Sequence, residues 1–168
     1  MTQHAKIANM NNEWHTPHQY IDSARKVMGS IDTDPASNDI AQEYIQADTY
    51  YTIDNSSLDK EWSGNVWMNP PYGRTIKDFC NKLVDEFESG RVKQAIVLTN
   101  NGTDTQWFDA LSGISSAICH HKKRIAFLRP TGERVNNNTK GQIFMYIGDN
   151  SQAFRDEFNQ YGATYRKA

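Results

Sequence analysis

The spacing of hydrophobic residues along the chain predicts helices that alternate with short apolar strands. The clearest helical period covers residues 76–87, and Gly90 follows its end. The apolar face of this helix would carry Ile76, Phe79, Cys80, Leu83, Val84 and Phe87. A second helix is predicted at residues 17–28, with Thr16 as its cap and Pro17 at its first position, which is a favoured pairing. Further helices are expected at residues 39–44, 103–111 and 151–161.

Short runs rich in apolar and β-branched residues predict the strands. These runs fall at residues 30–34, 49–53, 65–68, 94–99, 115–119, 125–128 and 142–147. Strands alternate with helices at first and then follow one another closely. This order predicts an α/β fold, in which a mostly parallel sheet has an antiparallel hairpin at one edge and helices on both faces. A length of 168 residues fits a single domain spanning residues 1–168.

The composition excludes membrane-spanning and disulfide-stapled proteins. No run approaches the roughly 20 apolar residues of a membrane span. The polar stretch 1–12, which is expected to be flexible, contains no secretory signal. Two cysteines make no disulfide framework. The protein is therefore expected to be cytoplasmic, without a membrane partner, and no obligatory protein partner is evident.

Positive charge is concentrated in one segment, although the formal net charge is only −2. Residues 120–140 hold six basic residues against Glu133 alone. Such a segment predicts contact with a polyanion, although a solvated basic loop has the same composition. The nucleic-acid contacts expected here are Lys122, Lys123, Arg124, Arg129, Arg134, Asn136 and Lys140. Residues 129–141 are predicted to form a loop that contacts the substrate, with the asparagines at 136–138 near groove edges.

A rigid turn follows the strand predicted at residues 65–68. It consists of Asn69, Pro70, Pro71 and Tyr72. The Asn69 side-chain oxygen and the Pro70 carbonyl can each accept a hydrogen bond from an exocyclic amino group. Because prolines fix φ and carry no N–H, they hold these acceptors without competing donors. Tyr72 can stack on the ring that carries the amine. The turn is therefore predicted to be catalytic, although a strand-ending turn with a surface tyrosine has the same sequence.

Other polar residues follow predicted strands at the same edge, where open α/β sheets bind small ligands. Asp34 ends the strand at 30–34, and it can bind an ammonium group or ribose hydroxyls, or cap a helix. The glycine-rich fingerprint of dinucleotide and triphosphate sites is missing, so a phosphate-free nucleoside cofactor fits better. No metal site is predicted, because the adjacent His120 and His121 would point to opposite faces of a strand.

Four separated motifs carry a resemblance to a known family. They are residues 13–17 (EWHTP), 31–38 (IDTDPASN), 69–73 (NPPYG) and 100–108, in this order. From about Glu13 to Gly148 the chain resembles the phage-type, Dam-like DNA N6-adenine methyltransferases. One departure is the stretch 37–39, Ser-Asn-Asp, which stands where many adenine methyltransferases have a glycine-rich turn.

The resemblance implies a Rossmann-like class I methyltransferase fold and S-adenosylmethionine as the cofactor. It implies that the Asn69–Tyr72 turn binds the amine of an adenine flipped out of double-stranded DNA, and that the methyl group passes by in-line displacement. The residues that would contact the cofactor are Trp14, Thr16, Pro17, Asp34, Pro35, Ala36 and Asp54. A phage or prophage origin in a bacterial host is likewise implied.

Two alternatives remain open on the residues alone. One is an N-methyltransferase that acts on an RNA adenine or a protein glutamine amide, because the turn suits either planar amine. The basic segment argues against a protein substrate but does not separate DNA from RNA. The other is an inactive nucleic-acid-binding module, against which the intact turn and Asp34 argue.

Overall fold

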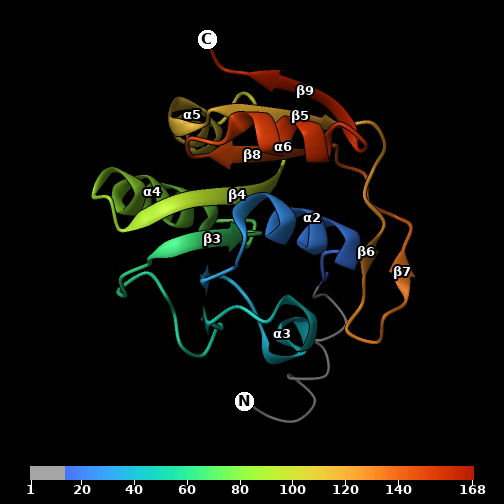
Figure 1. Ribbon diagram of the computed structural model, residues 1–168. Helices are drawn as coiled ribbons and strands as arrows, with labels where there is room; N and C mark the ends of the chain where they lie inside the picture. Colours follow the sequence, from blue (N-terminus) through green and yellow to red (C-terminus); the bar gives the residue numbers. More distant parts are fainter. Residues whose placement is uncertain (1–13) are drawn as a thin grey trace.

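A seven-stranded sheet forms the centre of the protein (Figure 1). The computed structural model describes residues 14–168, so the stretch expected to be flexible, 1–12, lies outside the described residues. The strands are β1 (Thr33–Asp34), β2 (Thr49–Tyr50), β3 (Gly64–Met68), β4 (Val92–Asn100), β5 (Ala117–His121), β8 (Gln142–Ile147) and β9 (Gly162–Arg166). Their order across the sheet is β2-β1-β3-β4-β8-β5-β9.

Five of the seven strands run in the same direction. β2, β1, β3 and β4 pair in parallel with their neighbours. β8 is antiparallel to both β4 and β5, and β9 is antiparallel to β5. Only β8 and β9 therefore oppose the other strands. This arrangement confirms the predicted α/β fold with a mostly parallel sheet and antiparallel pairing at one edge, and it is compatible with a Rossmann-like methyltransferase.

Helices cover both faces of the sheet (Figure 1). The helices of the described chain are α2 (His18–Met28), α3 (Asp39–Ile45), α4 (Ile76–Glu88), α5 (Gln106–Ile114) and α6 (Ser151–Phe158). α2 and α6 pack on one face, and α4 and α5 pack on the other. The helical spacing predicted for residues 76–87 is confirmed by α4, whose apolar stripe is buried.

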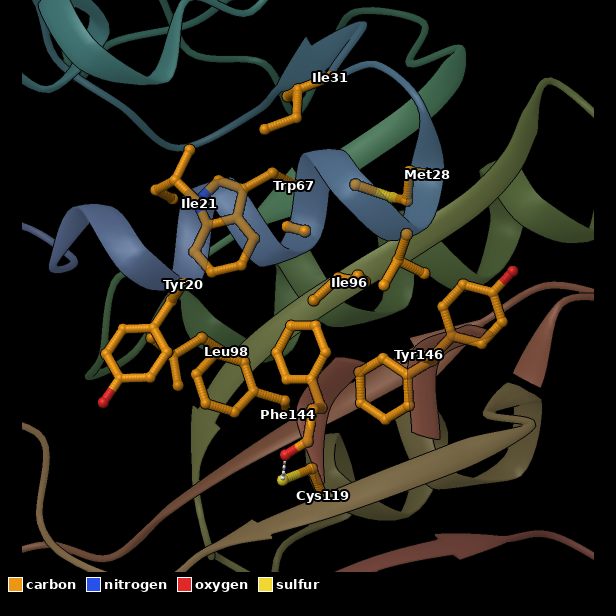
Figure 2. Packing of buried hydrophobic residues seen from close by; sticks show 14 of the residues in the cluster. Tyr20, Ile21, Met28, Ile31, Trp67, Ile96, Leu98, Cys119, Phe144 and Tyr146 are labelled. Atoms are coloured by element: carbon orange, nitrogen blue, oxygen red, sulfur yellow. Dashed lines mark hydrogen bonds between the residues drawn. The ribbon is translucent and has the colours of Figure 1, made fainter. Parts of the chain in front are cut away.

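Alternating side chains of the central strands supply the two cores. On β4, Ile96 and Leu98 join the core under α2 and α6, whereas Ala95 and Val97 join the core under α4 and α5. Figure 2 shows the first of these cores, in which Trp67 of β3 packs among residues of α2. Each fully buried large side chain contributes roughly 1.5–3 kcal/mol to the stability of the fold. These two cores therefore hold the carboxyl edge of the sheet in a fixed position.

Two short strands outside the main sheet form a hairpin. β6 (Phe127–Leu128) pairs antiparallel with β7 (Arg134–Val135), so part of the loop expected at 129–141 is a hairpin turn. The strand predicted at 125–128 therefore belongs to this hairpin and not to the main sheet. No helix within residues 14–168 is long and apolar enough to cross a membrane.

Candidate active site at the carboxyl edge of the sheet

Three of the motifs noted in the sequence, residues 31–38, 69–73 and 100–108, lie at the ends of neighbouring parallel strands. β1, β3 and β4 end at Asp34, Met68 and Asn100. Thr33 is opposite Val66 in the register of β1 and β3, and β3 pairs with β4 on its other side. The segment after β1 and the Asn69 turn after β3 therefore leave the sheet side by side, where open α/β sheets bind ligands.

The Asn69 side chain is held by the residue that precedes α2 by two positions. Asn69 Nδ2 donates a hydrogen bond to Thr16 Oγ1 at 3.3 Å, and Thr16 is buried. Pro70 is also buried, which fixes the carbonyl beside Asn69. Since the amide nitrogen is directed to Thr16, the Asn69 Oδ1 oxygen is the atom that a donor on a ligand can use.

Tyr72 is tethered at its hydroxyl while its ring remains accessible. The Asn100 backbone N–H donates to the Tyr72 hydroxyl at 2.8 Å. The residue is nevertheless 47% exposed, so part of Tyr72 is accessible to a ligand. Burial raises the pKa of the Tyr72 phenol, so the group is neutral at physiological pH. The turn then leaves through Gly73, whose φ of 100° favours glycine.

Asp34 is a carboxyl group buried at the end of β1. It is only 1% exposed; Gln42 Nε2 donates to its Oδ2 at 2.9 Å, and the Ala36 N–H donates to its Oδ1 at 3.3 Å. Burial raises the pKa of Asp34 to about 7, against the lowering effect of these hydrogen bonds. A buried carboxylate of this kind is suited to a cationic ligand, which would favour its ionised form.

The segment before α2 joins this site to the β6–β7 hairpin. His15 and Leu128 exchange two backbone hydrogen bonds of 2.7 and 2.8 Å. Trp14 stacks on Phe127 with ring centroids 5.7 Å apart. The prediction that Thr16 caps the helix is wrong, because α2 begins at His18 with Pro17 at the N-cap and the Thr16 hydroxyl serves Asn69 instead.

A family model of DNA N-6-adenine-methyltransferases (Dam) matches residues 3–162, nearly the whole chain. The chain belongs to this family. The match confirms the resemblance drawn from the four motifs. No curated protein sequence matches the chain.

The remaining residues expected to contact the cofactor differ in their surroundings in this Dam-family protein. Pro35 is buried, and its carbonyl accepts a hydrogen bond from Ser57 Oγ at 2.8 Å, so the loop after β1 is anchored. Ala36 is half-buried beside Asp34. Asp54 is exposed on the turn that the Thr52–Asn55 bridge closes after β2.

The residues expected to contact nucleic acid are mostly exposed in this Dam-family protein. Those with exposed side chains are Lys122, Lys123, Arg124, Arg134, Asn136 and Lys140. Arg129 is half-buried, and its Nε lies 3.8 Å from Glu133 Oε2 across the hairpin turn. The expectation of a groove-edge contact is wrong for Asn138, which is buried and donates its amide to Ile125 O and Gln142 Oε1. Phe127 is also buried and belongs to the core.

A cavity of about 390 Å³ opens between α3 and the hairpin turn. Thr16, Tyr44 and Arg129 contribute to its wall, whereas Asn69 and Asp34 do not. It therefore borders the Thr16 side of the site, next to the residue that holds Asn69.

Sequence reasoning missed the side chains that hold the site together in this Dam-family protein. Thr16 was expected to touch the cofactor, and its contact with Asn69 spans 53 positions of sequence. Two further contacts gave no sequence signal. The Asn100 backbone N–H donates to Tyr72, and the Gln142 amide donates to Asn100 Oδ1 at 2.9 Å. The one hint was the polar cluster at the end of β4.

Proposed function

We propose that this Dam-family protein transfers a methyl group from S-adenosylmethionine to the N6 amine of an adenine flipped out of double-stranded DNA. The observation that carries the proposal is the Asn69–Tyr72 turn, whose two end side chains are tethered to neighbouring elements. Asn69 is held by Thr16, and Tyr72 is held by Asn100. A site built in this way presents two acceptors and an aromatic face with little freedom to rearrange.

Asn69 and Pro70 act on the amine of the target base. The adenine N6 lone pair is delocalised into the ring, so the amine is a weak nucleophile. The Asn69 Oδ1 and the Pro70 carbonyl would each accept a hydrogen bond from one N–H of the amine. The nitrogen then becomes more tetrahedral, and its lone pair points away from the two acceptors. The Asn69–Thr16 contact of 3.3 Å supports this role, because it turns the amide oxygen toward the base.

Tyr72 supports base extrusion. Flipping a base out of the duplex costs a few kcal/mol, which stacking on an aromatic ring offsets. The partly exposed side chain of Tyr72 would supply such a surface, and its hydroxyl contact with Asn100 fixes the far end of the ring. A neutral phenol adds no charge beside the base. No histidine base is needed, because the proton can leave to water after the transfer.

The residues after β1 and before α2 would hold the cofactor. When bound, S-adenosylmethionine supplies an electrophilic methyl group on a sulfonium cation. The buried carboxyl of Asp34 fits such a cationic ligand, since burial without a counter-charge is what raises its pKa to about 7. The anchored backbone of Pro35 and Ala36 and the partly exposed Trp14 would complete the contact surface, and Thr16, Pro17 and Asp54 would border it.

The exposed basic residues of segment 122–140 would bind the DNA backbone. Contacts with DNA phosphates on both sides of the β6–β7 hairpin would orient the duplex over the Asn69–Tyr72 turn. The resemblance to phage-type enzymes supports action in the cytoplasm of a bacterial host on double-stranded DNA.

Tritium transfer tests the proposal. The protein is incubated with tritiated S-adenosylmethionine and, separately, with adenine-containing duplex DNA, RNA or a protein mixture, and the DNA and RNA products are digested to nucleosides. We expect label in N6-methyl-2′-deoxyadenosine from DNA, which Asn69→Ala abolishes while cofactor binding by calorimetry is retained. The matched control is Asn159→Ala at the exposed end of α6, which should keep full activity. Label in RNA or protein only, or a fully active Asn69→Ala, would refute the proposal.

A further inference from the structure

Gln142 links the end of β4 to the segment that precedes β8. It is the first residue of β8 and only 3% exposed. Its Nε2 donates to Asn100 Oδ1 at 2.9 Å, and its Oε1 accepts from Asn138 Nδ2 at 2.9 Å. The Asn100 backbone N–H in turn donates to the Tyr72 hydroxyl. Asn100 therefore connects Gln142 to Tyr72 through two hydrogen bonds.

Asn138 contacts both arms of the basic segment, which are residues 122–124 and the stretch that ends at Lys140. It is 7% exposed, and its Nδ2 also donates to the Ile125 carbonyl at 3.0 Å. Its Oδ1 accepts from the Lys140 N–H at 3.0 Å. Ile125 directly follows the basic residues 122–124, and Lys140 ends the second arm. One buried amide therefore fixes the backbone of both arms.

We propose that Asn138 and Gln142 are positioning residues that hold the DNA-binding segment at a fixed distance from Tyr72. The inference rests on the proposed function and goes beyond it, since it assigns a role to two amides that contact neither base nor cofactor. Buried amides are costly to leave without partners, and hydrogen bonds in series reinforce one another. A shift of either basic arm would therefore break contacts in the chain that ends at Tyr72.

The proposed network keeps two sites aligned: the basic arms that bind phosphates and the turn that binds the target base. Phosphate contacts set the register of a duplex on a protein, whereas the chemistry needs one base over the turn. An error of about 1 Å between these two sites costs roughly 100-fold in rate. A rigid amide connection between the basic arms and Asn100 removes that error without touching the DNA.

Gln142→Met removes the connection while nearly preserving side-chain volume, and Gln94→Met is its matched control. Gln94 also lies on β4, at the opposite end, beside Ala95, which pairs with Ile147 of β8. Its Nε2 donates to Met28 O and Asn65 Oδ1, and its Oε1 accepts from Tyr146. Both changes therefore delete an amide with several partners, and only one of these amides leads to Tyr72.

Hydrogen exchange tests the connection without relying on activity. In Gln142→Met, the N–H groups of Asn100 and Lys140 should both exchange roughly tenfold faster, and in Gln94→Met both should remain protected. Tyr72→Phe should accelerate exchange at Asn100. If Lys140 keeps its protection in Gln142→Met, or if Gln94→Met releases the same two groups, the network does not exist as a unit and the inference is overturned.

Methylation of a duplex containing adenine tests the role. Gln142→Met should lower kcat about tenfold more than Gln94→Met, with an unchanged Kd for S-adenosylmethionine and an unchanged salt dependence of DNA binding. Tyr72→Phe should add less in the Gln142→Met background than in the wild type. Additive effects would overturn the inference. A wild type that methylates no DNA refutes the proposed function instead, and the exchange result then decides the network alone.

Discussion

Replacing Asp34 with asparagine should stabilise the protein against unfolding, and more strongly as the pH rises. The Asp34 carboxyl is buried in the fold, which raises its pKa from 3.8 to about 7. In the unfolded chain the carboxyl loses its proton near the ordinary value. Between these two pKa values the folded state binds more protons than the unfolded state, so the stability of the wild type falls as the pH rises from about 4 to 7 and stays low above it.

The size of the effect follows from the two pKa values. Linkage gives a cost of about 2 kcal/mol at pH 5, where the fold keeps the carboxyl protonated, and of about 4 kcal/mol at pH 8, where the carboxyl is ionised in the fold. Asparagine cannot ionise, so it avoids both costs. It keeps an acceptor for the Ala36 N–H but loses the bond from Gln42, which removes about 1 kcal/mol at either pH. The advantage of the variant should therefore grow by about 2–3 kcal/mol between pH 5 and pH 8.

Urea unfolding of both proteins at the two pH values measures this change. Other carboxyl groups titrate alike in the two proteins, so the difference between them isolates Asp34. Glu88→Gln, at the exposed end of α4, is the control and should show no such growth. A difference between Asp34→Asn and the wild type that is the same at pH 5 and pH 8 would refute a raised pKa and, with it, the argument for a cation at this carboxyl.

The same group predicts how cofactor binding depends on pH. A sulfonium or ammonium beside Asp34 favours the ionised carboxyl, so binding must expel its proton below pH 7. The Kd for S-adenosylmethionine should then rise by up to about tenfold per pH unit as the pH falls below 7. Calorimetry in buffers of different ionisation enthalpy would detect the released proton, and Asp34→Asn should release none.

Two further predictions concern the turn and the basic segment. Thr16→Val removes the acceptor for the Asn69 amide and should lower kcat roughly tenfold, whereas Thr16→Ser should retain activity. The loss should shrink in an Asn69→Asp background, because a carboxylate presents an oxygen in either orientation; equal losses in both backgrounds would place the role of Thr16 elsewhere. Replacing Lys123 and Arg124 with alanine should reduce the slope of log K for DNA binding against log salt by about 2, as measured by fluorescence anisotropy. Lys93→Ala, at the exposed far end of β4, should leave the slope unchanged, and the proposed interface fails if the double variant does so too.

The fold could be predicted where one physical signal dominates a segment. α4 was predictable because its apolar residues recur at helical spacing, and β3 and β4 because buried parallel strands are continuous apolar runs. β9 was missed because only Gly162 of its residues is buried, so an edge strand of this kind shows no alternation. β7 consists of two residues and is defined by its partner β6.

The positions of the candidate site residues at the sheet edge could be predicted, whereas the contacts that support them could not. Residue types at the ends of predicted strands located Asp34 and the Asn69 turn, because the carboxyl edge of a parallel sheet is where ligands bind. Thr16 was taken for a helix cap, since a Thr-Pro pair favours that role in any sequence. Asn138 was taken for a DNA contact, because an asparagine-rich stretch is typical of exposed loops. Burial determines which contacts Thr16 and Asn138 make, and their burial depends on elements far away in the chain.

The Pro-Pro turn explains why such distant supports are needed. Two prolines fix φ but contribute no backbone N–H, and no backbone hydrogen bond joins two of the residues 69–72 to each other. Its end side chains must be fixed from outside, and the two contacts that do so come from residues 53 and 28 positions away. The geometry that we propose for amine activation therefore depends on the packing of both α2 and β4 against β3. Variants that loosen either element should lose methyl transfer before they lose the fold.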